Sequence, residues 1–163
     1  MTETHELPEF IHGIATQKSA SKQRREIVEK EYLKLLDKLG KKNGKDKKFV
    51  HNTFLDADVY ITMHESGKKA SYTSAFNWQS TYAIKQLEQV IKHAKPRDGE
   101  PIYFSPKSTG KQREFNYVNM ARLYYDFSDE SLGYMNFTVK LTLGIKSSGR
   151  HIQYSVNKIE VQK

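Results

Sequence analysis

The chain has 163 residues and a net charge of +8 at pH 7, from 27 lysines and arginines against 19 acidic residues. A chain of this length can bury enough surface for one folded domain, and its charge favours an anionic partner without indicating a fold. The absence of cysteine excludes disulfides, thiolate metal sites and a cysteine nucleophile.

The N-terminal residues 1–8 are polar and acidic, and we expect them to form a disordered arm on a single domain that covers residues 1–163. They do not have the apolar core of a standard signal peptide, and no apolar run is long enough to span a membrane. We therefore expect a cytoplasmic protein with no membrane partner, or one delivered into a target cell by a route without a signal peptide.

The first predicted elements are a short strand and a long helix. Residues 7–16 alternate weakly and predict a strand that carries His12. Apolar residues then recur at three- and four-residue steps and predict a helix of about five turns that ends at Gly40. This apolar stripe consists of Ile27, Val28, Tyr32, Leu35, Leu36 and Leu39. The basic residues 40–48 predict a loop with no apolar anchor.

Two further strands and a second helix follow. Residues 49–52 and 57–64 predict a strand pair, with His64 closing the second strand before a turn at 65–69. Residues 73–95 predict a second helix, because apolar side chains again fall on one face and Pro96 stops the pattern.

The clearest pattern is at the C-terminus. After a loop or hairpin at 101–112, residues 113–127, 134–146 and 150–161 alternate in polarity and are joined by short turns. Short connections between strands indicate an antiparallel meander. The sequence therefore predicts an α+β fold, in which an antiparallel sheet ends in a three-stranded meander and two main helices pack on one face.

Several kinds of chemistry lack their sequence signature. The six histidines show no pair at metal-ligand spacing, and there is no phosphate loop, dinucleotide fingerprint or nucleophile elbow, so we expect no metal and no cofactor. Ten tyrosines and eight phenylalanines beside many lysines are typical of nucleic-acid binders, since rings stack on bases and cations neutralise phosphates. Packing between strands explains the aromatic content equally well.

Metal-independent cleavage of a phosphodiester needs a base, an acid and cations for the charged intermediate. His12 and His64 are candidates for proton transfer, Lys68 and Lys69 for phosphate neutralisation, and Arg122 for the clamp on the transition state. Each of these residues has an ordinary alternative as an exposed polar position.

Other polar residues could complete such a site. Ser71 follows the two lysines, Tyr124 shares a strand face with Arg122, and His151 shares the polar face of the last strand with Gln153 and Ser155. The lysines of the predicted loop could guide RNA or simply keep the protein soluble. These are Lys41, Lys42, Lys45, Lys47 and Lys48.

This order of elements resembles the barnase–EndoU–colicin E5/D–RelE-like nuclease superfamily, in the version found in large polyvalent proteins of phages and mobile elements. The resemblance covers nearly the whole chain. The segments that carry it are FIHGI at 10–14, FVHNTFLDADVYITMHESGKKAS at 49–71, RLYYDF at 122–127, FTVKLTL at 137–143 and IQYSVNKIEV at 152–161.

The resemblance implies a toxin-like or effector-like endoribonuclease fold with RNA lying across the sheet. Carried over position by position, it puts His12, Lys69 and Ser71 near a catalytic face to which the meander adds Arg122 and Tyr154. The chain does not have the closely spaced histidine pair of the EndoU type. A mechanism of the colicin type, with lysine, arginine and hydroxyl groups around the phosphorane, fits these residues better.

The leading hypothesis is a metal-independent endoribonuclease that acts on transfer RNA or ribosomal RNA and leaves 2′,3′-cyclic phosphate ends. One alternative is a nucleic-acid-binding module without catalysis, which predicts salt-dependent binding of intact RNA. Another is an accessory protein of a mobile element whose basic face docks an acidic partner, such as an inhibitor protein.

Overall fold

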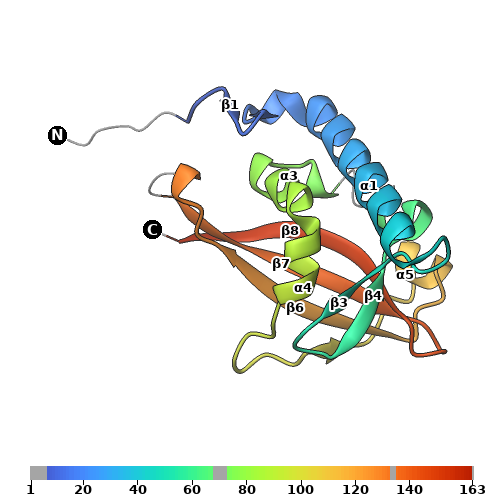
Figure 1. Cartoon of the computed structure of the whole chain (residues 1–163). Helices are drawn as coiled ribbons and strands as arrows, with labels where there is room; N and C mark the ends of the chain where they lie inside the picture. Colours follow the sequence, from blue (N-terminus) through green and yellow to red (C-terminus); the bar gives the residue numbers. More distant parts are fainter. Residues whose placement is uncertain (1–6, 68–72, 133–134, 163) are drawn as a thin grey trace.

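The computed structural model describes residues 7–67, 73–132 and 135–162, in which the longer helices lie on one face of a mixed sheet (Figure 1). The strands are β1 (Phe10–Ile11), β2 (Ile14–Ala15), β3 (Phe49–Asn52), β4 (Ala57–Tyr60), β5 (Tyr103–Phe104), β6 (Asn119–Phe127), β7 (Asn136–Ile145) and β8 (His151–Gln162). The helices are α1 (Ser21–Asn43), α3 (Trp78–Lys85), α4 (Leu87–His93) and α5 (Lys111–Glu114), with short helical turns η1 (Lys18–Ala20), η2 (Met63–Gly67) and η3 (Glu130–Leu132).

The large sheet has the strand order β3-β4-β8-β7-β6-β5 within the described residues. The meander β6-β7-β8 is antiparallel, as the sequence predicts. The pair β4–β8 is parallel, with Val59 beside His151 and Tyr60 beside Ile152. This parallel pair joins segments about ninety residues apart, and no local pattern in the sequence indicates it.

The helical layer confirms the predicted α+β class. Val28, Tyr32, Leu36 and Leu39 form the buried stripe of α1, which packs against α3, while α3 packs on β7 and β8 and α4 packs on β3. The predicted second helix is divided, because α3 ends at Lys85 and α4 begins at Leu87. The main core lies between these helices and the sheet. No helix within the described residues is long and apolar enough to cross a membrane.

Arg24 ties the start of this helical layer together. Its side chain is only 1% exposed and donates hydrogen bonds to the carbonyls of Ala15, Gln17, Ala75 and Phe76. A buried cation is tolerated here because carbonyl oxygens surround its planar fork. The guanidinium therefore joins β2, the start of α1 and the segment before α3.

Several local predictions need correction. His12 is not on a strand, because residues 7–16 form a β1–β2 hairpin whose turn holds His12 and Gly13 at φ 51° and 78°. α1 does not end at Gly40 but continues to Asn43, where Gly44 at φ 112° donates its N–H to the Gly40 carbonyl. This places Lys41 and Lys42 in the last helical turn.

The third correction concerns His64. β4 ends at Tyr60, and His64 lies in the single π-helical turn η2 that follows. The Ser66 hydroxyl donates to the Gln153 carbonyl, and the Thr62 hydroxyl accepts from the Glu65 N–H. The first bond fixes the turn against β8, and the second closes the turn itself.

A bulge in β8 changes which of its side chains share a face. Thr142 pairs with Ser155 and Leu143 pairs with Gln153, so Tyr154 is the extra residue. Gln153 faces α1, where its side-chain oxygen accepts a hydrogen bond from the Tyr32 hydroxyl at 2.7 Å. The predicted shared polar face of His151, Gln153 and Ser155 is therefore wrong, because the bulge reverses the alternation before Ser155.

A second, smaller cluster lies on the sheet face opposite α3 and α4, which we call the open face. It contains Phe115, Tyr117, Met120, Ile152 and Tyr154, with Tyr60 and Phe104 packed against it. The segment 105–118, including α5, supplies Phe115 and Tyr117 and covers part of the open face.

Candidate functional site

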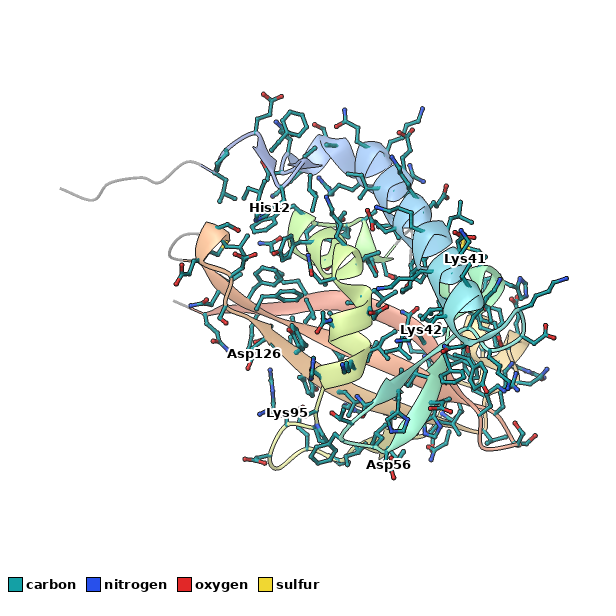
Figure 2. The ribbon with its side chains drawn as sticks, viewed as in Figure 1. His12, Lys41, Lys42, Asp56, Lys95 and Asp126 are labelled. Carbon is teal, nitrogen blue, oxygen red and sulfur yellow. The ribbon has the colours of Figure 1, made fainter. Side chains whose placement is uncertain are left out.

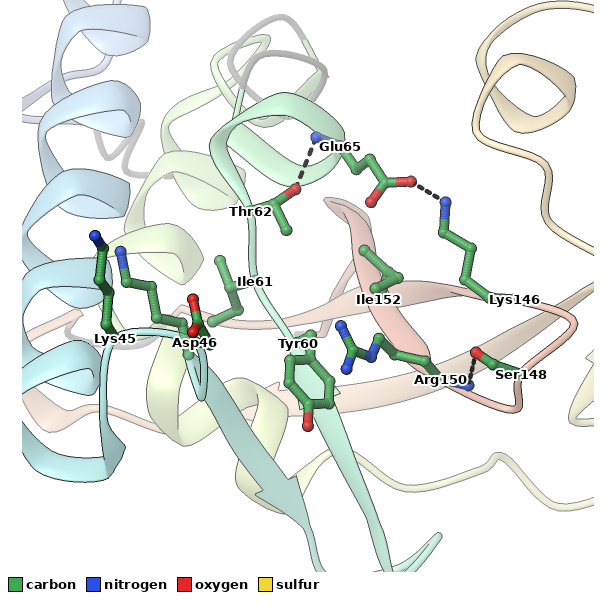
Figure 3. A pocket seen from close by; sticks show the side chains of 11 residues that line it. Lys45, Asp46, Tyr60, Ile61, Thr62, Glu65, Lys146, Ser148, Arg150 and Ile152 are labelled. Carbon is green, nitrogen blue, oxygen red and sulfur yellow. Dashed lines mark hydrogen bonds and ion pairs between the residues drawn. The ribbon is translucent and has the colours of Figure 1, made fainter.

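A cavity lined by four cationic side chains is formed by three segments that are distant in sequence (Figure 3). They are the loop after α1, the end of β4 with η2, and the β7–β8 hairpin. We call this cavity of about 520 Å³ the basic pocket. Its lining residues are Lys45, Asp46, Lys48, Tyr60, Ile61, Thr62, Glu65, Lys146, Ser148, Arg150 and Ile152.

The parallel β4–β8 pair explains why these segments meet. It places Tyr60 beside Ile152, so that the β7–β8 hairpin immediately before β8 lies next to the end of β4. The Arg150 guanidinium then lies over the Tyr60 ring, 4.1 Å from its centroid. On the other side, the Ile61 N–H donates to the Lys48 carbonyl at 3.0 Å. This bond holds residues 44–48, which we call the lysine loop, against β4.

The charges of the pocket are not balanced. Lys45, Lys48, Lys146 and Arg150 face only two carboxylates, Asp46 and Glu65. Lys146 is ion-paired with Glu65, whose side chain is 13% exposed, and it also donates to the Phe115 carbonyl. Among the described residues, Lys45, Lys48 and Arg150 form no ion pair, so these three cations remain for an anion.

Tyr117 adds a polar atom beside the Lys146–Glu65 pair. The Lys146 ammonium lies 5.1 Å from the centroid of its ring, and the hydroxyl is buried with no hydrogen-bond partner among the described residues. Burial, and then the charge of Glu65, raises the pKa of Tyr117. This phenol therefore stays protonated at neutral pH and can only serve as a neutral donor or acceptor.

Several predicted nucleic-acid-binding residues lie in or beside this pocket. Lys45 and Lys48 line it, and Lys47 belongs to the same loop. The backbone of His151 lies between two lining residues, but its pairing with Val59 puts its side chain on the sheet face that carries α3 and α4. His64, next to Glu65, is exposed and contacts Phe115 edge-on at 5.4 Å.

Lys41 and Lys42 are exposed at the end of α1, where Lys41 is ion-paired with Asp37 at 3.1 Å (Figure 2). Lys68, Lys69 and Ser71 lie outside the described residues. Their predicted roles in phosphate binding and catalysis stay predictions.

The predicted site residues of the meander, Arg122, Tyr124 and Tyr154, lie on the open face. The Arg122 guanidinium lies over the Phe104 ring at 4.1 Å, and Tyr124, two residues further along β6, lies under Arg97 at 4.3 Å. Tyr154 packs edge-on against Phe115 and Tyr117, and burial raises the pKa of Tyr154.

His12 lies in a different part of the molecule (Figure 2). Its Nε2 contacts the Ser131 hydroxyl at 2.7 Å, and Ser131 in turn donates to Asp129 at 2.7 Å. Hydrogen bonds from Tyr82 and Ser131 lower the pKa of Asp129 to about 2. Asp129 therefore orients the Ser131 hydroxyl but is a weak base for it.

His12 and the basic pocket are near opposite ends of α1, whose 23 residues span roughly 35 Å. His12 contacts Ser131, which follows the end of β6 at Phe127. Arg122 lies five residues before that end, or roughly 17 Å away along the strand. The structure thus does not bring His12 together with Arg122 or with the basic pocket.

Sequence reasoning did not identify Arg150, Lys146, Glu65 or Tyr60. Lys146 and Arg150 bracket the tight turn at 147–149, and two cations on either side of a turn are a signal that could have singled out this hairpin. Nothing in the sequence indicates that this turn faces the lysine loop, because that depends on the parallel pair.

No group of histidine and carboxylate side chains in the described ranges has a metal-binding arrangement. No protein-family model matches this chain, and no curated protein or solved structure matches it significantly. The geometry of the site is therefore the basis for a functional proposal.

Proposed function

We propose that this protein binds RNA and holds phosphate groups of the strand in the basic pocket. The observation that carries the proposal is the convergence of Lys45, Lys48 and Arg150 on one cavity, without ion-pair partners among the described residues. Cations held apart from carboxylates attract phosphates, and each phosphate that they neutralise releases counterions from the nucleic acid.

Two further features support the proposal, and the first of them favours nucleic acid over another polyanion. Arg150 is stacked on Tyr60, so its planar guanidinium can contact a base and a phosphate at once. The net charge of +8 adds long-range attraction to any extended anion.

The test is binding of a fluorescent RNA to the full chain in EDTA over a series of salt concentrations. We expect Lys48→Ala and Arg150→Ala each to weaken binding several-fold and to reduce the slope of log affinity against log salt by about 0.7–1. Both changes remove a cation from the pocket and leave the folded core untouched.

Lys22→Ala is the matched control, because Lys22 is exposed in the first turn of α1, roughly 30 Å along the helix from Asn43. It should bind RNA almost as the wild type does. Absence of binding at low salt would reject the proposal, as would equal loss in all three variants.

Metal-independent RNA cleavage is a second candidate, which one observation favours. Glu65 places a carboxylate among the cations, beside Lys146 and next to His64, so a proton acceptor and phosphate-binding groups share one pocket. Discrete cleavage in EDTA with 2′,3′-cyclic phosphate ends, abolished by Glu65→Gln, would establish it. Intact RNA after long incubation with a binding-competent protein would leave the binding function alone.

A further inference from the structure

One end of the basic pocket differs in charge from the rest. There the Lys146 ammonium is paired with Oε1 of Glu65, so that η2 is joined to the β7–β8 hairpin across the cavity (Figure 3). The other cations of the lining lie outside this ion pair. We call this part of the pocket, formed by Thr62, Glu65 and Lys146, the neutral end.

The neutral end offers one acceptor and one donor to a ligand. Lys146 contacts Oε1 of Glu65, and Oε2 has no hydrogen-bond partner within residues 7–67, 73–132 and 135–162. The Thr62 hydroxyl oxygen accepts the Glu65 N–H at 2.9 Å, so its own hydrogen is left to donate. A carboxylate oxygen and a hydroxyl donor in the same end of a pocket suit ligand groups that both donate and accept, which hydroxyls do.

A phosphate is a poor fit at the neutral end. The Glu65 side chain is mostly buried, and its negative charge repels another anion strongly where little water screens it. Lys146 already compensates that charge. Phosphate belongs in the cationic part of the pocket, where the Arg150 guanidinium covers the Tyr60 ring. The two parts of the pocket therefore select different parts of one ligand.

The β7–β8 hairpin sets the spacing between the two parts. The Lys146 N–H donates to the Arg150 carbonyl at 2.9 Å, so the two residues face each other across the hairpin. The Cα atoms of such a pair are roughly 5.5 Å apart. From there Lys146 reaches Glu65, and Arg150 reaches Tyr60. The cavity of about 520 Å³ is large enough for one nucleotide across this span.

We propose that the basic pocket captures the 3′ end of an RNA strand, with the 2′,3′-diol of the last ribose at the neutral end and its 5′-side phosphate on Arg150. The inference rests on the proposed RNA binding and names the part of the strand that enters the pocket. Oε2 of Glu65 accepts from one hydroxyl of the diol, and the Thr62 hydroxyl donates to the other. An internal nucleotide carries a phosphate on its 3′-oxygen, and that phosphate would meet the charge of Glu65.

The first arm of the test keeps the protein unchanged and varies the end of the RNA. Unlabelled RNAs of one sequence, about sixteen nucleotides long, compete in EDTA with a labelled RNA that ends in a free diol. One competitor ends in a diol, one in a 3′-phosphate and one in a periodate-oxidised ribose, and a fourth is closed into a circle. We expect each of the three altered RNAs to bind about tenfold more weakly than the diol form, since each loses hydrogen bonds to a charged group.

The second arm changes the neutral end. In Glu65→Gln the diol and 3′-phosphate forms should bind within about twofold of each other, because the amide carries no charge. Thr62→Val should weaken binding of the diol form several-fold, and Thr62→Ser, which keeps the hydroxyl, should restore it. Glu29→Gln is the matched control, since Glu29 is an exposed carboxylate of α1 outside the pocket, and it should keep the wild-type preference.

Equal competition by all four RNAs in the wild type would overturn capture of the 3′ end and leave general RNA binding by the pocket in place. A preference for the diol that survives both Glu65→Gln and Thr62→Val would overturn the assignment to the neutral end. A labelled RNA that stays unbound even at low salt would reject the RNA function itself, and the inference with it.

Discussion

At the scale of single residues, hydrogen bonds to carboxylates fix the position of individual polar side chains. His51 on β3 is held between two carboxylates, with Nδ1 at 2.8 Å from Asp58 and Nε2 at 2.9 Å from Asp56. The hydrogen bond to Asp58, and then that to Asp56, raises the pKa of His51 above its usual 6.5. The protonated imidazole therefore links β3 to β4 and to the turn between them.

This arrangement predicts a pH dependence of stability. Because the folded state raises the pKa, the contribution of His51 is full below pH 6.5 and is lost as the pH rises through the folded-state value. The difference in melting temperature between wild type and His51→Gln should shrink from pH 5.5 to pH 8.5. The effect is small because the side chain is 47% exposed. A difference that does not change with pH would contradict the assignment.

At the scale of elements, the packing of segment 105–118 on β7 depends on a missing side chain. A Cβ at Gly144 would lie 2.4 Å from the ring of Tyr117, so only glycine lets this ring lie flat on the strand. The contact anchors the second cluster, in which Tyr117 also meets Phe115 and Tyr154.

Gly144→Ala should destabilise the protein by about 1–3 kcal/mol, since the added methyl group forces the Tyr117 ring off the sheet. Urea unfolding measures this. In a Tyr117→Leu background the same substitution should cost much less, because the ring that it collides with is gone. Equal costs in both backgrounds would show that the effect arises in β7 itself.

At the scale of the whole molecule, the two clusters lie on opposite faces of one sheet. Trp78, the single tryptophan, packs edge-on against Phe137 in the main core, while Tyr117 and Tyr154 belong to the second cluster. Strands β6 and β8 contribute residues to both clusters. Because both clusters pack on the same sheet, unfolding of that sheet exposes both of them.

We therefore expect one cooperative unfolding transition, as the predicted single domain requires. Urea denaturation followed by Trp78 fluorescence and by the tyrosine signal in near-ultraviolet circular dichroism should give coincident midpoints. Separate midpoints would mean that segment 105–118 unfolds independently of the main core.

The sequence by itself determined the α+β class, the meander and the buried stripe of α1, because these depend on local periodicity and short turns. It also singled out Lys45 and Lys48 through the charge of their loop. Local rules misplaced His12 and His64, since an alternating pattern does not distinguish a strand from the two sides of a tight hairpin or from a strand that ends early.

Only the tertiary structure decided which cations meet. The parallel β4–β8 pair brings Arg150 and Lys146 to the lysine loop, and the bulge at Tyr154 puts Ser155 beside Thr142 rather than with Gln153. Both features depend on pairing between distant segments, whose free energy comes from the packed sheet and helices together. The candidate site is therefore a property of the assembled sheet, although each of its residues can be read from the sequence.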